Sequence, residues 1–313
     1  MGTNKHALPA KVRLFEVGPR DGLQNERVHL NVQQKVELIL GLIDAGMRDI
    51  EVGSFVHPKW IPQMADTDAV LRALPKRDDV RYWVLVPNLR GLEGAIEAGA
   101  ENIAVFLSSS ESHNKKNINR SIDESLESLR EVTAVARGEA MTIRGYVSTV
   151  FGCPYEGDVD FTRVLEITGA LIEMGASQVS LGDTTGMGSP YQVRDRLERA
   201  LDVFPTEQLA LHLHDTRGLG LANALVGLEV GMTTFDTSVG GMGGCPYAPG
   251  ASGNLGSEDL VHMLQTAGVE TGVDLARLLD VSRLLENDFG TTLNSRFYRY
   301  AQADARPASR ATS

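Results

Sequence analysis

The feature of this sequence that most restricts its fold is an alternation of short β-branched runs with longer helix-like segments, repeated eight times. Eight such units predict an α/β protein of the (β/α)8 TIM-barrel type, in which eight parallel strands form a closed sheet inside a ring of helices. The predicted strands are Val12–Glu16, Asp49–Gly53, Arg81–Val86, Asn102–Leu107, Thr142–Ser148, Gln178–Gly182, Leu209–His214 and Thr234–Ser238.

The segments between these strands are amphipathic and are predicted to be helices. Several of them end in a glycine that leads directly into the next strand, and glycine just past the last turn is a favoured helix stop. The predicted helices are Val32–Ala45, Leu89–Ala98, Ile122–Arg137, Phe161–Met174, Tyr191–Phe204 and Leu219–Val230, with two more after the eighth strand at about 257–267 and 274–286.

An open, doubly wound sheet is the alternative arrangement of such units. It needs fewer strands and usually carries Gly-x-Gly-x-x-Gly after the first one, whereas Gly18-Pro19-Arg20-Asp21-Gly22 follows here. The sequence has no Pro/Ser-rich internal linker. We therefore expect one catalytic barrel domain over residues 1–302 that includes extra C-terminal helices, and a small polar tail over 303–313 that is disordered.

The amino-acid composition indicates which binding partners and which cellular compartment to expect. The net charge of −11 argues against binding to nucleic acid and to anionic membrane surfaces. Only two cysteines occur, so a disulfide framework is not expected and a reducing compartment fits. The sequence contains no apolar run long enough to span a membrane, and Met1 to Lys11 lack the apolar core of a secretory signal. We expect a cytoplasmic protein that acts on a small molecule.

Polar side chains gather where the predicted strands end, which is the active face of a barrel. His212 and His214 are two residues apart in the seventh strand, so their side chains point the same way. Two neutral imidazoles can share a divalent cation, and Asp21 and Asn254 would add oxygen ligands at the same rim. This mixed set suits Mg²⁺ or Mn²⁺, with Zn²⁺ or Co²⁺ as substitutes. The alternative is a pair of hydrogen-bonded core histidines.

Arg20 precedes Asp21, so a guanidinium would stand beside this centre. Its expected task is to hold or polarise an oxygen that gains negative charge. Glu51, in the second predicted strand, could be a base or could fix Arg20 through an ion pair. Both interpretations of Glu51 remain open from the residues alone.

Residues 240–256 string glycines and prolines around Cys245 and Asn254. Glycine lets a backbone approach a ligand closely, so this segment predicts a binding loop that carries a reactive thiol. The alternative is a surface turn with an unused cysteine. Gly152-Cys153-Pro154-Tyr155 nearly repeats Gly244-Cys245-Pro246-Tyr247, and we interpret Cys153 as a packing residue.

These motifs resemble those of the 3-hydroxy-3-methylglutaryl-CoA (HMG-CoA) lyases, in the metal-dependent barrel superfamily of lyases and Claisen-condensing enzymes. The resemblance covers about Val12 to Leu279. It rests on Glu16-Val17-Gly18-Pro19-Arg20-Asp21-Gly22-Leu23-Gln24-Asn25-Glu26, Glu51-Val52-Gly53-Ser54-Phe55, Pro58-Lys59-Trp60, Lys115-Lys116-Asn117-Ile118-Asn119, Gly182-Asp183-Thr184, His212-Leu213-His214-Asp215 and the segment from Gly243 through Asn254.

The resemblance implies a role for each matching residue. The implied metal ligands are Asp21, His212, His214 and Asn254. The implied substrate contacts are Arg20, Gln24 and Ser54. The implied catalytic group is the Cys245 thiol, with Arg20, Glu51 and Asp183 supporting the acid–base chemistry.

The resemblance also implies a reaction, the retro-Claisen cleavage of HMG-CoA to acetoacetate and acetyl-CoA. One alternative is a lyase for a larger 3-hydroxy-3-alkylglutaryl-CoA. Another is a Claisen-condensing synthase of the same superfamily, although such synthases usually carry an added regulatory domain. A third is a catalytically idle metal-binding or scaffold protein. Barrels of this kind often pair, so we expect a homodimer or a higher homo-oligomer.

Overall fold

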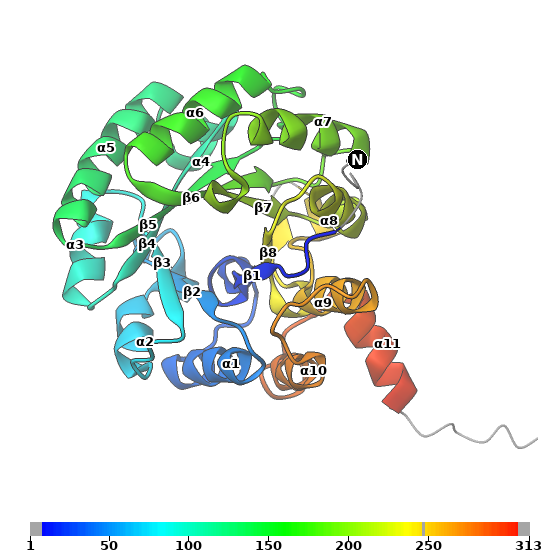
Figure 1. The fold of residues 1–313 in the computed structure, drawn as a ribbon. Coiled ribbons are helices and arrows are strands. Elements are labelled where there is room, and N and C mark those ends of the chain that lie inside the picture. Colours follow the sequence, from blue (N-terminus) through cyan, green and yellow to red (C-terminus); the bar gives the residue numbers. More distant parts are fainter. Residues whose placement is uncertain (1–7, 246–247, 306–313) are drawn as a thin grey trace, which may run out of the picture.

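The computed structural model describes residues 8–245 and 248–305. Eight parallel strands close into a barrel in sequence order, with β1 pairing to both β2 and β8, which confirms the predicted (β/α)8 fold (Figure 1). The strands are β1 (Arg13–Glu16), β2 (Asp49–Ser54), β3 (Arg81–Leu85), β4 (Asn102–Ser108), β5 (Thr142–Ser148), β6 (Ala176–Asp183), β7 (Leu209–Leu213) and β8 (Thr234–Thr237).

Helices surround the barrel on its outside (Figure 1). They are α1 (Val32–Asp44), α2 (Thr67–Ala73), α3 (Leu89–Glu97), α4 (Glu111–Ile118), α5 (Ile122–Gly138), α6 (Phe161–Glu173), α7 (Pro190–Leu201), α8 (Gly220–Glu229), α9 (Ser257–Thr266), α10 (Leu275–Arg283) and α11 (Arg296–Ala305). All predicted helices are present within three residues at either end, whereas α2, α4 and α11 were not predicted. Within the described ranges, no helix combines the length and the apolar character that a bilayer crossing requires.

The C-terminal segment differs in part from the prediction of a disordered tail over 303–313. Helix α11 continues to Ala305, so residues 303–305 are helical. The rest of the predicted tail lies outside the described residues.

Local sequence signals explain where the helices begin and end. Asn31 caps α1 and Ser121 caps α5, each in a reciprocal capping box with the residue three positions later. After α1 the chain turns at Gly46, whose φ of 105° is in the region that favours glycine. A Cβ at this glycine would lie 2.2 Å from the carbonyl oxygen of Gly272, so a larger residue does not fit. These signals fix the points at which helices α1 and α5 begin and at which α1 leads into β2.

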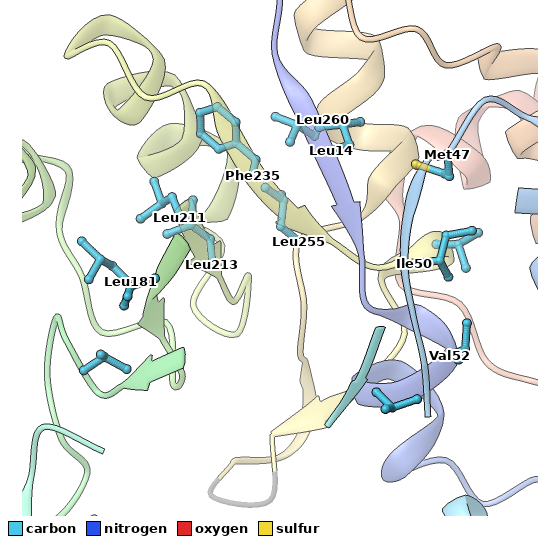
Figure 2. Close-up of a cluster of buried hydrophobic side chains, with 14 of the residues drawn as sticks. Leu14, Met47, Ile50, Val52, Leu181, Leu211, Leu213, Phe235, Leu255 and Leu260 are labelled. Atoms are coloured by element: carbon cyan, nitrogen blue, oxygen red, sulfur yellow. The ribbon is translucent and has the colours of Figure 1, made fainter. Parts of the chain in front are cut away.

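The main hydrophobic core lies between the strands and the outer helices (Figure 2). Its buried side chains come from the outward positions of the strands and from the inner faces of the helices that cover them. Those labelled in Figure 2 are Leu14, Met47, Ile50, Val52, Leu181, Leu211, Leu213, Phe235, Leu255 and Leu260. The barrel interior holds polar and charged groups together with two smaller apolar clusters, one around Phe15 and Trp83 and one around Leu85 and Ala104.

At the N-terminal ends of the strands, which form the floor of the barrel, the buried carboxylate of Asp49 binds side chains from neighbouring strands. Asp49 accepts hydrogen bonds from Arg13 Nε and Nη2 at 2.5 Å each and from Arg81 Nε and Nη2 at 2.8 and 3.0 Å. Trp83 Nε1 adds a fifth donor at 3.1 Å. These contacts join the starts of β1, β2 and β3, so Asp49 fixes the register of three strands.

We expect Asp49→Asn to destabilise the protein, because the amide cannot accept from both guanidinium groups. Arg13 and Arg81 are partly exposed and regain water, so the free energy of unfolding should fall by about 1–3 kcal/mol. Urea denaturation followed by circular dichroism measures the change. Asp79→Asn, which removes an exposed carboxylate paired with Arg77, is the control and should leave stability unchanged. Equal stability of the two variants would contradict the assigned role of Asp49.

Candidate metal centre and active site

The turn after β1 presents Arg20 and Asp21 at the C-terminal rim of the barrel. The backbone N–H groups of Arg20, Asp21 and Gly22 all donate to the carbonyl of Val17, which winds Gly18–Gly22 into a tight π-helical turn. A Cβ at Gly18 would lie 2.6 Å from Glu16 Oε1, so this position requires glycine. The local sequence therefore delivers a guanidinium and a carboxylate side by side.

Glu16 anchors this turn from beneath. Its Oε1 accepts from the backbone N–H groups of Gly18 and Val239, each at 2.8 Å, and its Oε2 accepts from Ser257 Oγ at 2.6 Å. Burial raises the pKa of Glu16 to about 8 even though these donors oppose the shift. This one side chain thus ties the turn after β1 to the segment after β8.

Arg20 is held between two carboxylates. Its Nε donates to Glu51 Oε2 and its Nη1 donates to Asp21 Oδ1, both at 2.6 Å. Burial raises the pKa of Glu51 against the opposing effect of Arg20. Burial also opposes ionisation of Asp21, but Arg20 and the two imidazoles lower its pKa well below its ordinary value. Asp21 is therefore an anion at neutral pH and a good cation ligand.

His212 lies in β7 and His214 lies just beyond it, and their side chains meet as the alternation predicted. The two Nε2 atoms are 3.1 Å apart. Burial, with the neighbouring His212, lowers the pKa of His214 to about 3, so its imidazole is neutral. The ligand atoms of Asp21, His212 and His214 all lie within 4.8 Å of one another.

This cluster fits a divalent metal ion. At 3.1 Å one Nε2 can donate a hydrogen bond to the other, and two unprotonated Nε2 atoms can instead bind one cation, with the Asp21 carboxylate beside them. Asn254, the fourth predicted ligand, lies next to this set: its Nδ2 donates to Asp21 Oδ2 at 2.7 Å and to the Met242 carbonyl at 3.1 Å. Its ligand role remains a prediction.

The glycine-rich segment after β8 forms a short hairpin. Strand β9 (Gly244–Cys245) pairs antiparallel with β10 (Ala248–Ser252). The side chains of residues 244–252 lie outside the described part of the structure, so the predicted role of the Cys245 thiol remains a prediction. By contrast Cys153 is buried, with its Sγ 2.9 Å from Ser110 Oγ, in agreement with a packing role.

The remaining predicted residues lie around this centre. Asp183 accepts from the backbone N–H groups of Met187 at 2.8 Å and Gly188 at 3.1 Å, and burial raises its pKa to about 6. It therefore holds the loop after β6 in shape. Gln24 Oε1 and Ser54 Oγ are buried polar atoms with no hydrogen-bond partner within the described residues. A substrate that reaches them would satisfy both.

Comparison with known proteins identifies the family. Residues 11–285 match the family model described as HMGL-like. The chain belongs to the HMGL-like family.

Relatives in this family match over nearly their whole length. A hydroxymethylglutaryl-CoA lyase of Bacillus subtilis is 50% identical over 288 residues, which are 92% of this chain and 96% of the relative. The solved hydroxymethylglutaryl-CoA lyase of Pseudomonas aeruginosa is 46% identical with a TM-score of 0.93, covering 95% of this chain and 99% of that one. An HMG-CoA lyase of Acinetobacter baumannii, solved in complex with coenzyme A and 3-methylmalate, is 37% identical with a TM-score of 0.88, covering 100% of this chain and 99% of that one.

Among the described residues, four polar side chains that support Glu51 and His212 were not predicted. Tyr146 Oη donates to Glu51 Oε2 at 3.3 Å. The other three form a cluster below His212: Arg144, Ser180 and Asp236. The only signal in the sequence is a charged or hydroxyl side chain in the middle of a predicted strand, where an apolar residue is expected.

We expect the metal-free protein to lose stability as the pH rises from 6.5 to 8.5. Buried Glu16, with a pKa of about 8, and Glu258, with a pKa of about 7, are protonated in the folded state over part of this range. Both are already ionised in the unfolded chain, so rising pH favours unfolding until the folded pKa is passed. His214 has the opposite effect, but mainly below pH 6.5, because its pKa is lowered.

Thermal denaturation at pH 6.5, 7.5 and 8.5 in the presence of a chelator tests this expectation. Glu16→Gln removes one of the two titrating groups and should flatten the decline. A variant whose midpoint falls as steeply as that of the wild type would contradict the role given to Glu16.

Proposed function

We propose that this protein is a carbon–carbon lyase that cleaves 3-hydroxy-3-methylglutaryl-CoA into acetoacetate and acetyl-CoA. The observation that carries the proposal is the convergence of Asp21, His212 and His214 within 4.8 Å beside the guanidinium of Arg20. The relatives named as hydroxymethylglutaryl-CoA lyases, at up to 50% identity over most of the chain, support the same reaction. The substrate partner is then an acyl-CoA.

The cofactor in this proposal is Mg²⁺ or Mn²⁺, with Zn²⁺ or Co²⁺ as substitutes. Asp21, His212 and His214 would hold it, with Asn254 as a further oxygen ligand. A divalent cation supplies positive charge that makes the 3-hydroxyl group of the substrate easier to deprotonate.

Arg20 stabilises the charge that develops during cleavage. Once a basic group of the site takes up the hydroxyl proton, the oxygen forms a carbonyl at C3, the C2–C3 bond breaks, and its electron pair moves into the thioester as an enolate. Arg20 is fixed through Nε and Nη1, so we expect Nη2 to face the enolate oxygen. Glu51 acts as a positioning residue here, because its Oε2 is engaged by both Arg20 and Tyr146.

The enolate must gain a proton at C2 to become acetyl-CoA, and we assign that step to the thiol of Cys245. An unperturbed thiol, with a pKa near 8.5, is largely protonated at neutral pH and can donate. Gln24 and Ser54 would bind substrate oxygens, and Asp183 would keep the loop after β6 in place. We also propose a cytoplasmic, homo-oligomeric protein.

Purified protein with Mg²⁺ should release acetoacetate from HMG-CoA and should lose this activity in excess chelator.

Asp21→Ala should lose bound metal and turnover together, since it removes a ligand. Elemental analysis and an acetoacetate assay measure the two properties. Asp195→Ala, which removes an exposed carboxylate on α7, is the acidic control and should keep the metal content and turnover of the wild type. A fully active, metal-loaded Asp21→Ala variant would refute the ligand assignment, and cleavage only of longer 3-hydroxy-3-alkylglutaryl-CoA esters would refute the substrate.

Cys245→Ala should lower kcat by about 10²–10⁴-fold while metal binding is kept, because it removes the proton donor. Cys153→Ala provides a control at the other Gly-Cys-Pro-Tyr sequence, where the thiol is buried in packing and turnover should be near that of the wild type. Steady-state kinetics with metal analysis distinguish the two. An unchanged kcat for Cys245→Ala would exclude the thiol as the acid.

A further inference from the structure

A buried ion pair lies inside the barrel directly below His212. Arg144, on β5, donates from Nη2 to Asp236 Oδ1 at 2.6 Å and from Nη1 to Asp236 Oδ2 at 3.2 Å, across the barrel to β8. The guanidinium carbon lies 3.9 Å from the ring centroid of Phe15 and 4.8 Å from that of Tyr146. Two hydrogen bonds and two aromatic rings thus fix the orientation of both charged groups.

The other hydrogen bonds of Asp236 show whether it donates to or accepts from His212. An arginine can only donate, and Ser180 Oγ donates to Oδ2 at 2.8 Å, so the carboxylate is the acceptor in each of these contacts. His212 Nδ1 lies 3.2 Å from the same Oδ2. The proton between them therefore belongs to Nδ1, which donates it to Asp236.

A neutral imidazole with its proton on Nδ1 has its lone pair on Nε2. Nε2 is the atom of His212 that points to His214, at 3.1 Å, and toward the cluster with Asp21. We propose that Asp236 and Arg144 are positioning residues, which hold His212 in the tautomer whose Nε2 lone pair faces the metal centre. This inference rests on the metal centre of the proposed function. It adds the two residues that leave His212 Nε2 free to bind the metal.

Arg144 also determines the His212 tautomer, because it fixes the orientation that an asparagine amide would take in Asp236→Asn. In Asp236→Asn the amide oxygen would stay on the guanidinium, which has only donors to offer. The amide nitrogen would then face His212 Nδ1 as a donor and force the imidazole proton onto Nε2. A serine protease triad behaves in this way when its aspartate is replaced by asparagine, and the histidine is left in the wrong tautomer.

The tautomer can be measured without metal or substrate. In ¹⁵N-histidine-labelled protein, with His212 signals assigned through His212→Gln, nitrogen chemical shifts should show a protonated Nδ1 and an unprotonated Nε2. Asp236→Asn should reverse the two. Its dissociation constant for Mn²⁺, from isothermal titration calorimetry, should rise by about 10–100-fold, which is the usual effect of losing such a partner.

Asp49→Asn is the matched control, since it removes another buried carboxylate held by arginines, at the far end of the barrel. It should keep the His212 tautomer and the Mn²⁺ affinity of the wild type, although it loses stability. Asp236→Glu retains an anionic acceptor and should retain the tautomer.

Two results would overturn the inference. One is a wild-type His212 whose proton is on Nε2, which needs no folded variant to establish. The other is a folded Asp236→Asn protein with the tautomer and Mn²⁺ affinity of the wild type. Failure of the proposed function would appear differently, as a wild-type protein that binds Mn²⁺ with the expected tautomer and does not cleave HMG-CoA.

Discussion

The interior of this barrel keeps ionised side chains away from water, and each one must find an opposite charge there. Asp49 meets Arg13 and Arg81 at the floor, Asp236 meets Arg144 in the middle, and Glu51 meets Arg20 at the rim. A buried pair adds little net stability, but the loss of one partner is costly because a charge is left unpaired. The partners come from different strands and turns, so each pair links separate elements of the barrel.

Two pairs of buried carboxylates differ in what faces them and in the direction of their pKa shifts. Asp21 and Asp236 face cations or imidazoles, and their pKa values are lowered. Glu16 and Glu258 face backbone N–H groups and serine hydroxyls, and burial raises their pKa values. The first pair belongs to the proposed metal centre and the residues that support it, whereas the second pair holds the loops that carry this centre. Asp21 therefore stays an anion near neutral pH while the loop anchors titrate.

Much of this architecture could be predicted because it depends on local periodicity. Strand alternation placed His212 and His214 on one side, and the barrel rule placed Asp21 and Asn254 at the same rim. The pairing of Arg144 with Asp236 could not be predicted, because its partners are 92 residues apart and meet only across the closed barrel. Helix α4 was missed for a different reason: its sequence, Glu-Ser-His-Asn-Lys-Lys-Asn-Ile, has almost no apolar stripe. Local sequence patterns do not show which residues far apart in the chain form ion pairs or hydrogen bonds with each other.

The hairpin that carries Cys245 begins and ends beside Asn254, the fourth proposed metal ligand. Before the hairpin, Gly243 has a φ of 104°, and a Cβ there would lie 2.6 Å from Asn254 Nδ2. This position therefore requires glycine. On the way out, Gly253 accepts from the backbone N–H of Asp215, and Asn254 follows with its contact to Asp21. Below the hairpin, Glu258 holds the backbone N–H of Gly240 with both carboxylate oxygens. The segment that carries the proposed acid is therefore joined directly to Asn254 and, through its hydrogen bond, to Asp21.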